Sequence, residues 1–199
     1  MSKYQNDRVF TDYIFNNLAK KIVYPKLSWE EVKIEKKELE KLDINNGIDA
    51  IIKNKNNELF GLQYRFRDSY YSSLYNDVTL RYKREYNKNK ERVMSEFFKI
   101  EAKYFLYGIS NGKKFEDNLH TNTNFLKWAV IDIDNLLKAI DDELIVIDET
   151  LNGITCQFKN GKMFCPINNN NDNSSSFVPF DIPMLNKISN NIIVASSGF

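Results

Sequence analysis

The chain has 199 residues, 42% of them hydrophobic and 28% charged, which suits a single globular domain with one substantial core. Its net charge of +1 argues against an indiscriminate nucleic-acid binder, and no apolar run approaches the roughly 18–20 residues of a membrane span. Two cysteines and a single histidine argue against a disulfide framework and a structural zinc site. Because the N-terminus is polar and shows no secretory signal, we expect a cytoplasmic protein without a membrane partner.

Charge is unevenly distributed along the chain. Residues 1–60 carry 11 basic and 10 acidic side chains, residues 61–113 carry 11 and 6, and residues 114–199 carry 6 and 11. The middle segment therefore has a net charge of +5 and the last segment a net charge of −5. This split predicts that the middle segment presents a basic surface to an anionic partner.

The N-terminal part of the chain predicts a helix and then a polar segment. Residues 6–24 place apolar side chains at helical spacing, and Pro25 should end this first helix. Residues 28–43 are rich in Glu and Lys and predict a polar strand followed by a short helical turn. Ser28, with acidic residues shortly after it, is typical of a capped helix start.

Two apolar runs then predict an antiparallel hairpin. Residues 48–52 and 59–67 flank a linker, residues 53–58, that contains only Lys, Asn and Glu. We expect the two strands to pair symmetrically about Asn56.

This register gives one face of the hairpin an unusual chemistry. It sets Asp49 opposite Gln63, and Arg65, two residues further on, points to the same face as Gln63. A solvated outer sheet face would also explain such a polar row, so alternation alone leaves a structural and a catalytic interpretation open.

A basic and aromatic segment follows. Residues 68–76 form a loop of Ser and Tyr, residues 77–86 a strand with one basic face, residues 91–101 a helix, and residues 103–109 a buried strand. Arginine binds phosphate and tyrosine stacks on bases, although core packing would also account for many of the aromatic residues. The candidate nucleic-acid contacts are Arg67, Tyr70, Tyr71, Arg81, Lys83 and Arg84.

The last third of the chain is acidic and rich in predicted strands. We expect a strand at 125–132, a helix at 134–142, a strand at 143–147 and a hairpin of 154–158 with 162–166 about Asn160. Cys156 and Cys165 should be two reduced core thiols. The Asn- and Ser-rich residues 168–176 predict a flexible loop. Residues 1–113 are expected to form the core, and residues 114–199 either to continue it or to form a small β-rich appendage.

The pattern of Asp49, then Gln63, one intervening residue and Arg65 resembles the active site of the PD-(D/E)XK nuclease superfamily. The resemblance covers roughly residues 6–110 and includes the order strand, strand, strand, helix, strand. Gln63 stands where Glu or Asp is usual, and Arg65 where Lys is usual. The fold that it implies is an α/β domain with a mixed central sheet, flanking helices and a restriction-endonuclease-like core, to which the β-rich C-terminal third is added.

The resemblance also implies a function. Asp49 and Gln63 would bind Mg²⁺ or Mn²⁺, Asp12 on the first helix would be a further metal ligand, with Asp43 as an alternative acid, and Arg65 would stabilise charge. The expected activity is that of a metal-dependent phosphodiesterase of the DNA endonuclease type.

Two other classes of function stay open. One is a catalytically inactive nuclease-fold module that binds nucleic acid, and the other is an inhibitory or structural domain that binds a protein. Nucleic acid is the expected partner, with DNA favoured over RNA, and the sequence leaves monomer and homodimer open.

Overall fold

The computed structural model describes residues 3–85, 92–151, 153, 155–171 and 173–199 as a mixed α/β protein built on a six-stranded mixed sheet. Only the β3–β6 pair in this sheet is parallel, and every other neighbouring pair is antiparallel. In order across the sheet, the strands are β1 (Glu30–Val32), β2 (Ala50–Lys53), β3 (Leu59–Arg67), β6 (Tyr104–Ser110), β7 (Phe125–Asp132) and β13 (Ile193–Ser197).

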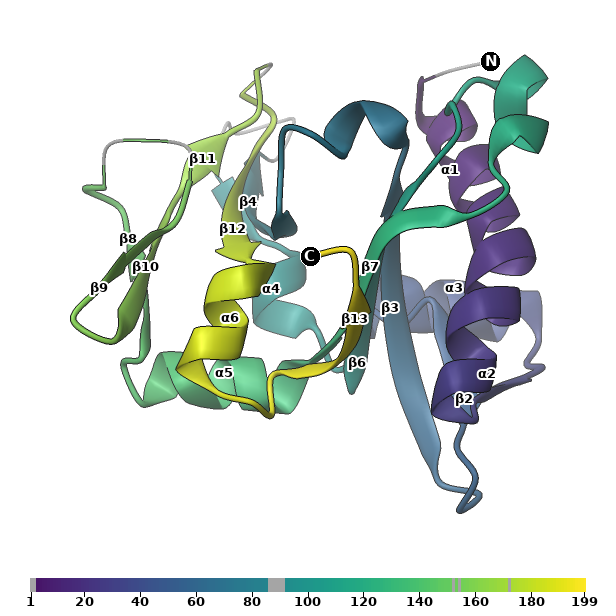
Figure 1. The fold of residues 1–199 in the computed structure, drawn as a ribbon, viewed down its shortest axis with the longest axis horizontal. Coiled ribbons are helices and arrows are strands. Elements are labelled where there is room, and N and C mark those ends of the chain that lie inside the picture. Colours follow the sequence, from purple (N-terminus) through teal and green to yellow (C-terminus); the bar gives the residue numbers. More distant parts are fainter. Residues whose placement is uncertain (1–2, 86–91, 152, 154, 172) are drawn as a thin grey trace.

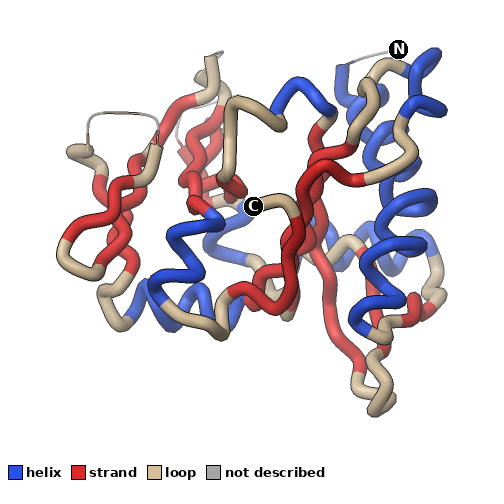
Figure 2. Tube along the Cα trace, viewed as in Figure 1, coloured by secondary structure: helices blue, strands red, loops and turns tan. Residues whose placement is uncertain are grey.

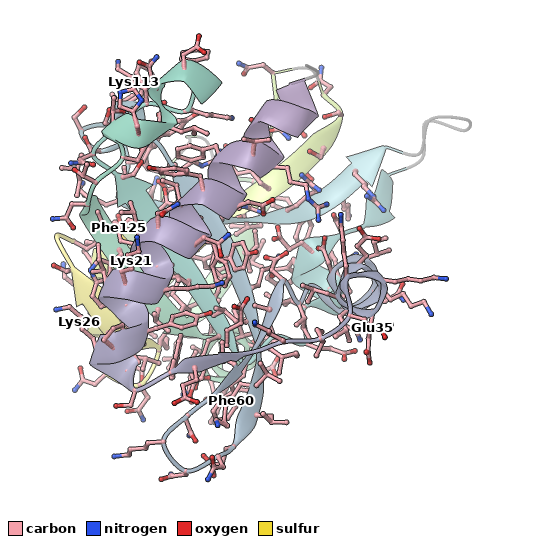
Figure 3. The ribbon with its side chains drawn as sticks, turned by 90° about the vertical axis from the view of Figure 1, so that its right-hand side faces the viewer. Lys21, Lys26, Glu35, Phe60, Lys113 and Phe125 are labelled. Atoms are coloured by element: carbon pink, nitrogen blue, oxygen red, sulfur yellow. The ribbon has the colours of Figure 1, made fainter. Side chains whose placement is uncertain are left out.

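A long N-terminal helical segment covers one face of this sheet (Figure 1). It runs without a break through α1 (Lys3–Ile14), the π-helical η1 (Phe15–Val23) and α2 (Tyr24–Leu27). Figure 3 shows it crossing the sheet diagonally, with Lys21 and Lys26 on the helix. Its apolar side chains pack on those of β2 and β3, and the Phe15 ring stacks on Tyr64 at 4.3 Å between centroids.

The other face of the main sheet packs against shorter helices and two small sheets (Figure 2). The helices on this side are α4 (Glu96–Lys99), α5 (Ile133–Asp141) and α6 (Ile182–Ile188). One small sheet has the order β11 (Asn168–Asn169), β12 (Ser175–Asp181), β4 (Asp77–Glu85), β5 (Arg92–Met94). The other has the order β8 (Ile145–Asp148), β10 (Lys162–Pro166), β9 (Gln157–Lys159). The remaining elements are α3 (Lys36–Asn46), η2 (Ser69–Tyr71) and η3 (Glu116–Thr121).

The chain beyond residue 113 is interleaved with the chain before it. Strands β7 and β13 complete the main sheet beside β6, and β12 pairs with β4 along seven residues of register. Cys156 and Cys165 lie in the core on this side, with 3.6 Å between their Sγ atoms. Both are free thiols, as predicted.

The predicted first helix and hairpin are confirmed, but the helix does not end at Pro25. This proline lies in α2, the last turn of the continuous helix, which extends two residues beyond it to Leu27. The helix ends at Ser28, which has a left-handed backbone with φ of 54°. Ser28 therefore terminates a helix, and the predicted capping role at a helix start is wrong.

Two further predictions of local structure are wrong. The helix predicted at 91–101 is a short strand, β5, followed by the single turn α4, and residue 91 lies outside the described residues. The loop predicted at 168–176 contains β11 and the first residues of β12, because the two segments pair with each other. Residue 172 lies outside the described residues.

The end of the first helix gives a test of the fold. Replacing Ser28 by Gly should raise the free energy of unfolding by about 0.5–1 kcal/mol, because glycine adopts a left-handed backbone without a Cβ clash. Urea denaturation measures this change. The control is Ser73→Gly, at an exposed position without positive φ, which should destabilise or have no effect. Equal destabilisation by both substitutions would contradict the left-handed end.

Candidate functional site

The β2–β3 hairpin brings Asp49 and Gln63 to opposite positions. Ala50 pairs with Leu62 and Lys53 with Leu59, so the strands are symmetric about Asn56, as the sequence predicts. Asp49 lies just before β2, and its N–H donates to the Leu62 carbonyl at 2.9 Å. The Tyr64 N–H donates to Asp49 Oδ2 at 2.9 Å, so the carboxylate replaces the backbone partner that β2 no longer provides.

The sequence alone predicts no role for Glu96, but in the structure Glu96 accepts hydrogen bonds from two of the predicted site residues, Gln63 and Arg65. It begins α4 and is buried, with 7% of its surface exposed. Its Oε1 accepts hydrogen bonds from Gln63 Nε2 and, at 2.8 Å, from Arg65 Nη2. Its Oε2 accepts from Arg65 Nη2 at 2.7 Å and from the Arg81 backbone N–H at 2.8 Å.

Arg65 is held from two sides by this arrangement. Its Nη2 contacts both oxygens of Glu96, and its Nη1 donates to the Thr79 carbonyl and, at 3.1 Å, to Thr79 Oγ1. The guanidinium thus links β3 of the main sheet to β4 of the small sheet. Its charge is balanced by Glu96 within the protein, which limits what it can offer to a substrate.

The electrostatic environment keeps Glu96 ionised. Burial raises the pKa of Glu96, but the charge of Arg65, the hydrogen bond from the Arg81 N–H and the charge of Arg81 outweigh burial. The pKa of Glu96 therefore lies below its ordinary value. A buried carboxylate with this many donors is a fixed acceptor.

Gln63 has an amide oxygen without a partner. Its side chain is 7% exposed, its nitrogen donates to Glu96, and Oε1 is buried without a hydrogen bond in the described part of the chain. This oxygen lies beside Gly47, the left-handed residue that ends α3, since a Cβ built there would be 3.4 Å from it. A buried acceptor without a donor costs free energy, and in native proteins it often marks the place of an ion or a water.

Asp49, the carboxylate opposite this oxygen, titrates near neutrality. Burial raises the pKa of Asp49 from its ordinary value of 3.8 to about 7, and the charges of Asp43 and Glu96 add to the effect. The Tyr64 N–H and the charge of Arg65 act in the other direction but are outweighed. A bound cation would stabilise the ionised form of this carboxylate.

The two further acids proposed from the sequence, Asp43 and Asp12, differ in whether their charge acts on Asp49. Asp43 on α3 is close enough for its charge to raise the pKa of Asp49. Asp12 is exposed on α1, which packs on the Tyr64 side of β3, and its charge acts on Tyr64. Within the described residues, no three side chains of His, Cys, Asp or Glu converge closely enough to hold a metal ion by themselves.

The candidate nucleic-acid contacts lie on β4 and around η2. Arg81 and Arg84 are exposed on β4, where they sit close enough to influence each other, and the charge of Arg81 also acts on Glu96. Lys83 is half-buried, with its Nζ 5.3 Å from the centre of the Tyr82 ring.

Near η2, the Cζ atom of Arg67 lies 5.1 Å from the centre of the Tyr71 ring, and Tyr70 is 69% exposed. Tyr71 packs against the core, so Tyr70 is the more accessible of the two rings.

Glu96 is the site residue that sequence reasoning missed. The sequence did contain one signal for Glu96. It is the single acid between Ser95 and the Phe97–Phe98 pair, in a run that is otherwise uncharged. Such a lone charge is unusual for a solvated helix face. Its partners lie 15, 31 and 33 residues away in the chain, so local pattern could not identify them.

Comparisons with known proteins give no relative for this chain. No family model matches it, and the searches of curated proteins and of solved structures find no match. Among the described residues, no helix is long and apolar enough to cross a bilayer. The function has to be argued from the site itself.

The raised pKa of Asp49 predicts how stability depends on pH. Between pH 3.8 and about 7 the folded protein keeps a proton on Asp49 that the unfolded chain has released, so stability falls as pH rises through this range. Asp49→Asn should remove this fall and, at pH 8 without divalent metal, stabilise the protein by up to about 4 kcal/mol. Urea denaturation at pH 5 and pH 8 tests this, with Asp141→Asn, an exposed acid, as the control. An unchanged pH slope in Asp49→Asn would contradict the raised pKa.

Proposed function

We propose that this protein is a metal-dependent phosphodiesterase that cleaves nucleic acid, with DNA as the favoured substrate, and that Asp49 and Gln63 bind the metal. The observation that carries the proposal is the pairing of a buried, unpartnered amide oxygen, Gln63 Oε1, with a carboxylate, Asp49, whose pKa is raised to about 7. Both features cost free energy in the protein alone, and one bound cation would relieve both.

The donor set fits a hard divalent cation. Mg²⁺ binds oxygen ligands, keeps several waters, and is often held by one or two carboxylates together with substrate phosphates. Asp49 uses Oδ2 for the Tyr64 N–H, which leaves Oδ1 for a metal, and Gln63 supplies a neutral oxygen. Asp43 is better placed than Asp12 to contribute a second acid, because its charge acts on Asp49. Water and substrate oxygens would complete the coordination of the cation.

The order of the elements supports a restriction-endonuclease-like core. A helix precedes the antiparallel strands β1, β2 and β3, and the chain then crosses over through α4 to β6, which is parallel to β3. The order that the sequence predicts, strand, strand, strand, helix and strand, corresponds to β2, β3, β4, α4 and β6, but β4 belongs to the small sheet, so only β2, β3 and β6 of these strands lie in the main sheet. Asp49, just before β2, and Gln63, on β3, lie at opposite positions of the hairpin, as the proposed active site requires.

The residues of the site have distinct roles in this proposal. A bound metal supplies Lewis-acid polarisation of the phosphoryl group and lowers the pKa of a water. Asp49 and Gln63 would hold this metal through their oxygens, which as acceptors cannot bind the phosphate themselves. Arg65 stays attached to Glu96 and keeps β3 in position, and the exposed arginines of β4 provide positive charge for the nucleic-acid backbone.

A non-catalytic module that binds nucleic acid is the second candidate. The observation that favours it is the ion pair between Arg65 and Glu96, at 2.7 Å, which neutralises the cation nearest to Asp49 and Gln63. A nuclease with this pair has to stabilise transition-state charge through its metal instead. The two candidates differ in turnover and share the basic surface.

Cleavage should depend on divalent metal and on Asp49. A labelled DNA should be cut in Mg²⁺ or Mn²⁺ and not in Ca²⁺ or EDTA, and Asp49→Ala should reduce the rate by at least about 100-fold, as expected when a group that stabilises the transition state is lost. Asp141→Ala, on the exposed face of α5, is the matched control and should cut normally. Cleavage that survives Asp49→Ala would place the active site elsewhere. DNA that is bound but never cut would favour the binding module.

Nucleic-acid binding should depend on β4 and on salt. Replacing Arg81 and Lys83 together by Ala should weaken binding to all DNA sequences alike and reduce the slope of log affinity against log salt by about 1.8, because each phosphate contact contributes about 0.9. Fluorescence anisotropy at several salt concentrations measures this slope. The control removes the same charge from α3 through Lys37→Ala and Lys41→Ala, which should leave the slope unchanged. Salt-independent binding, or an equal effect of the control, would contradict this surface.

A further inference from the structure

We propose that Glu96 is the positioning residue of the Asp49–Gln63 site and that it determines why residue 63 is a glutamine. In this role Glu96 binds the nitrogen of the Gln63 amide and so turns the oxygen towards the metal position. This inference rests on the proposed function, because it assigns a purpose to the direction of that oxygen.

The direction of the amide follows from hydrogen-bond chemistry. An ionised carboxylate only accepts hydrogen bonds, whereas an amide has a donor end and an acceptor end. Only the nitrogen of Gln63 can therefore face Glu96 Oε1, and Oε1 of Gln63 must point away. It lies beside Gly47 and Ile100, since a Cβ built on Gly47 would be 3.4 Å from this oxygen and 3.5 Å from Ile100 Cα.

Both carboxylate oxygens of Glu96 are themselves held by hydrogen bonds. Glu96 Oε1 is shared by Gln63 and Arg65, and Oε2 is shared by Arg65 and the Arg81 N–H. These donors come from β3 of the main sheet and from β4 of the small sheet. The position of the Gln63 oxygen is consequently fixed by tertiary structure rather than by its own rotamer preference.

The same contact explains the departure from the usual acid at this position. A carboxylate at residue 63 would face the carboxylate of Glu96 at hydrogen-bond distance, and two like charges there repel each other. Glutamine avoids this repulsion and still offers one oxygen to a cation. Residues 63 and 96 should therefore work as a pair of one amide and one carboxylate.

Exchanging the two side chains tests this pairing. Gln63→Glu alone places two carboxylates together, and Glu96→Gln alone puts an amide N–H₂ among the donors of Gln63, Arg65 and Arg81. The double variant restores one donor and one acceptor between positions 63 and 96. We expect each single change to weaken Mn²⁺ binding at least ten-fold and the double variant to bind within three-fold of the wild type or more tightly.

Isothermal titration with Mn²⁺ measures these affinities, at a temperature where circular dichroism shows every variant to be folded. Glu143→Gln is the control, since Glu143 is an exposed glutamate paired with Lys162 at 3.8 Å. A purely structural role for Glu96 would lower the melting temperature of the single variants without changing the Mn²⁺ affinity of the folded protein. Equal affinity in all variants would overturn the positioning role while the proposed function stands. A wild type without Mn²⁺ binding would overturn both.

A measurement on the wild type keeps the proposal testable if a single variant fails to fold. The chain has three glutamines, Gln5, Gln63 and Gln157, so ¹⁵N-glutamine labelling gives three side-chain amide signals. The Gln63 amide protons should exchange with solvent at least ten-fold more slowly than those of Gln157, which is exposed, and Mn²⁺ should broaden the Gln63 signal first. Exchange as fast as that of Gln157 would overturn the contact with Glu96.

Discussion

The arrangement of the site depends on one buried charge, the carboxylate of Glu96. An ionised carboxylate in the protein interior is stable only when it is paired and hydrogen-bonded, and here an arginine, an amide and a backbone N–H provide the donors. Because these donors belong to β3 and β4, the single side chain attaches the main sheet to the small sheet. Removing the charge would leave the half-buried Arg65 without its ion-pair partner and would leave the Gln63 amide N–H₂ and the Arg81 N–H without their acceptor. The geometry of Gln63 and Arg65 follows from this constraint.

Two unfavourable features remain once Glu96 has been satisfied, at opposite positions of the hairpin. Among the described residues Gln63 Oε1 is buried without a donor, and burial, together with the charges of Asp43 and Glu96, raises the pKa of Asp49 to about 7. The cation that we propose would remove both costs at once. Asp49 is held in place by the Tyr64 N–H, so its carboxylate is positioned by the protein itself.

The hairpin and its register could be predicted from the sequence because both depend on local signals, an Asn- and Lys-rich linker between two apolar runs. Features that depend on contacts between residues far apart in the chain could not be predicted in this way. Residues 168–176 look like a loop by composition, yet residues 168–169 and 175–176 lie in strands, because β11 pairs with β12 and β12 pairs with β4, far away in the chain. Arg65 was expected to stabilise charge at the site, and its ion pair with Glu96 involves a partner 31 residues away. The role of Glu96 depends on contacts of α4 with both β3 and β4. The spacing of residue types along the chain does not reveal contacts of this kind.

The most direct test of the central claim is to locate a metal ion in crystals of the protein. Crystals soaked in Mn²⁺ near pH 7.5 and measured at the manganese absorption edge would show an anomalous peak wherever the ion binds. The account predicts a peak within about 2.5 Å of both an Asp49 carboxylate oxygen and Gln63 Oε1, since divalent ions bind oxygen ligands at about 2.0–2.6 Å. A well-occupied peak elsewhere, for example beside the Asp77–Asp181 pair on β4 and β12, with no density at Asp49, would contradict it.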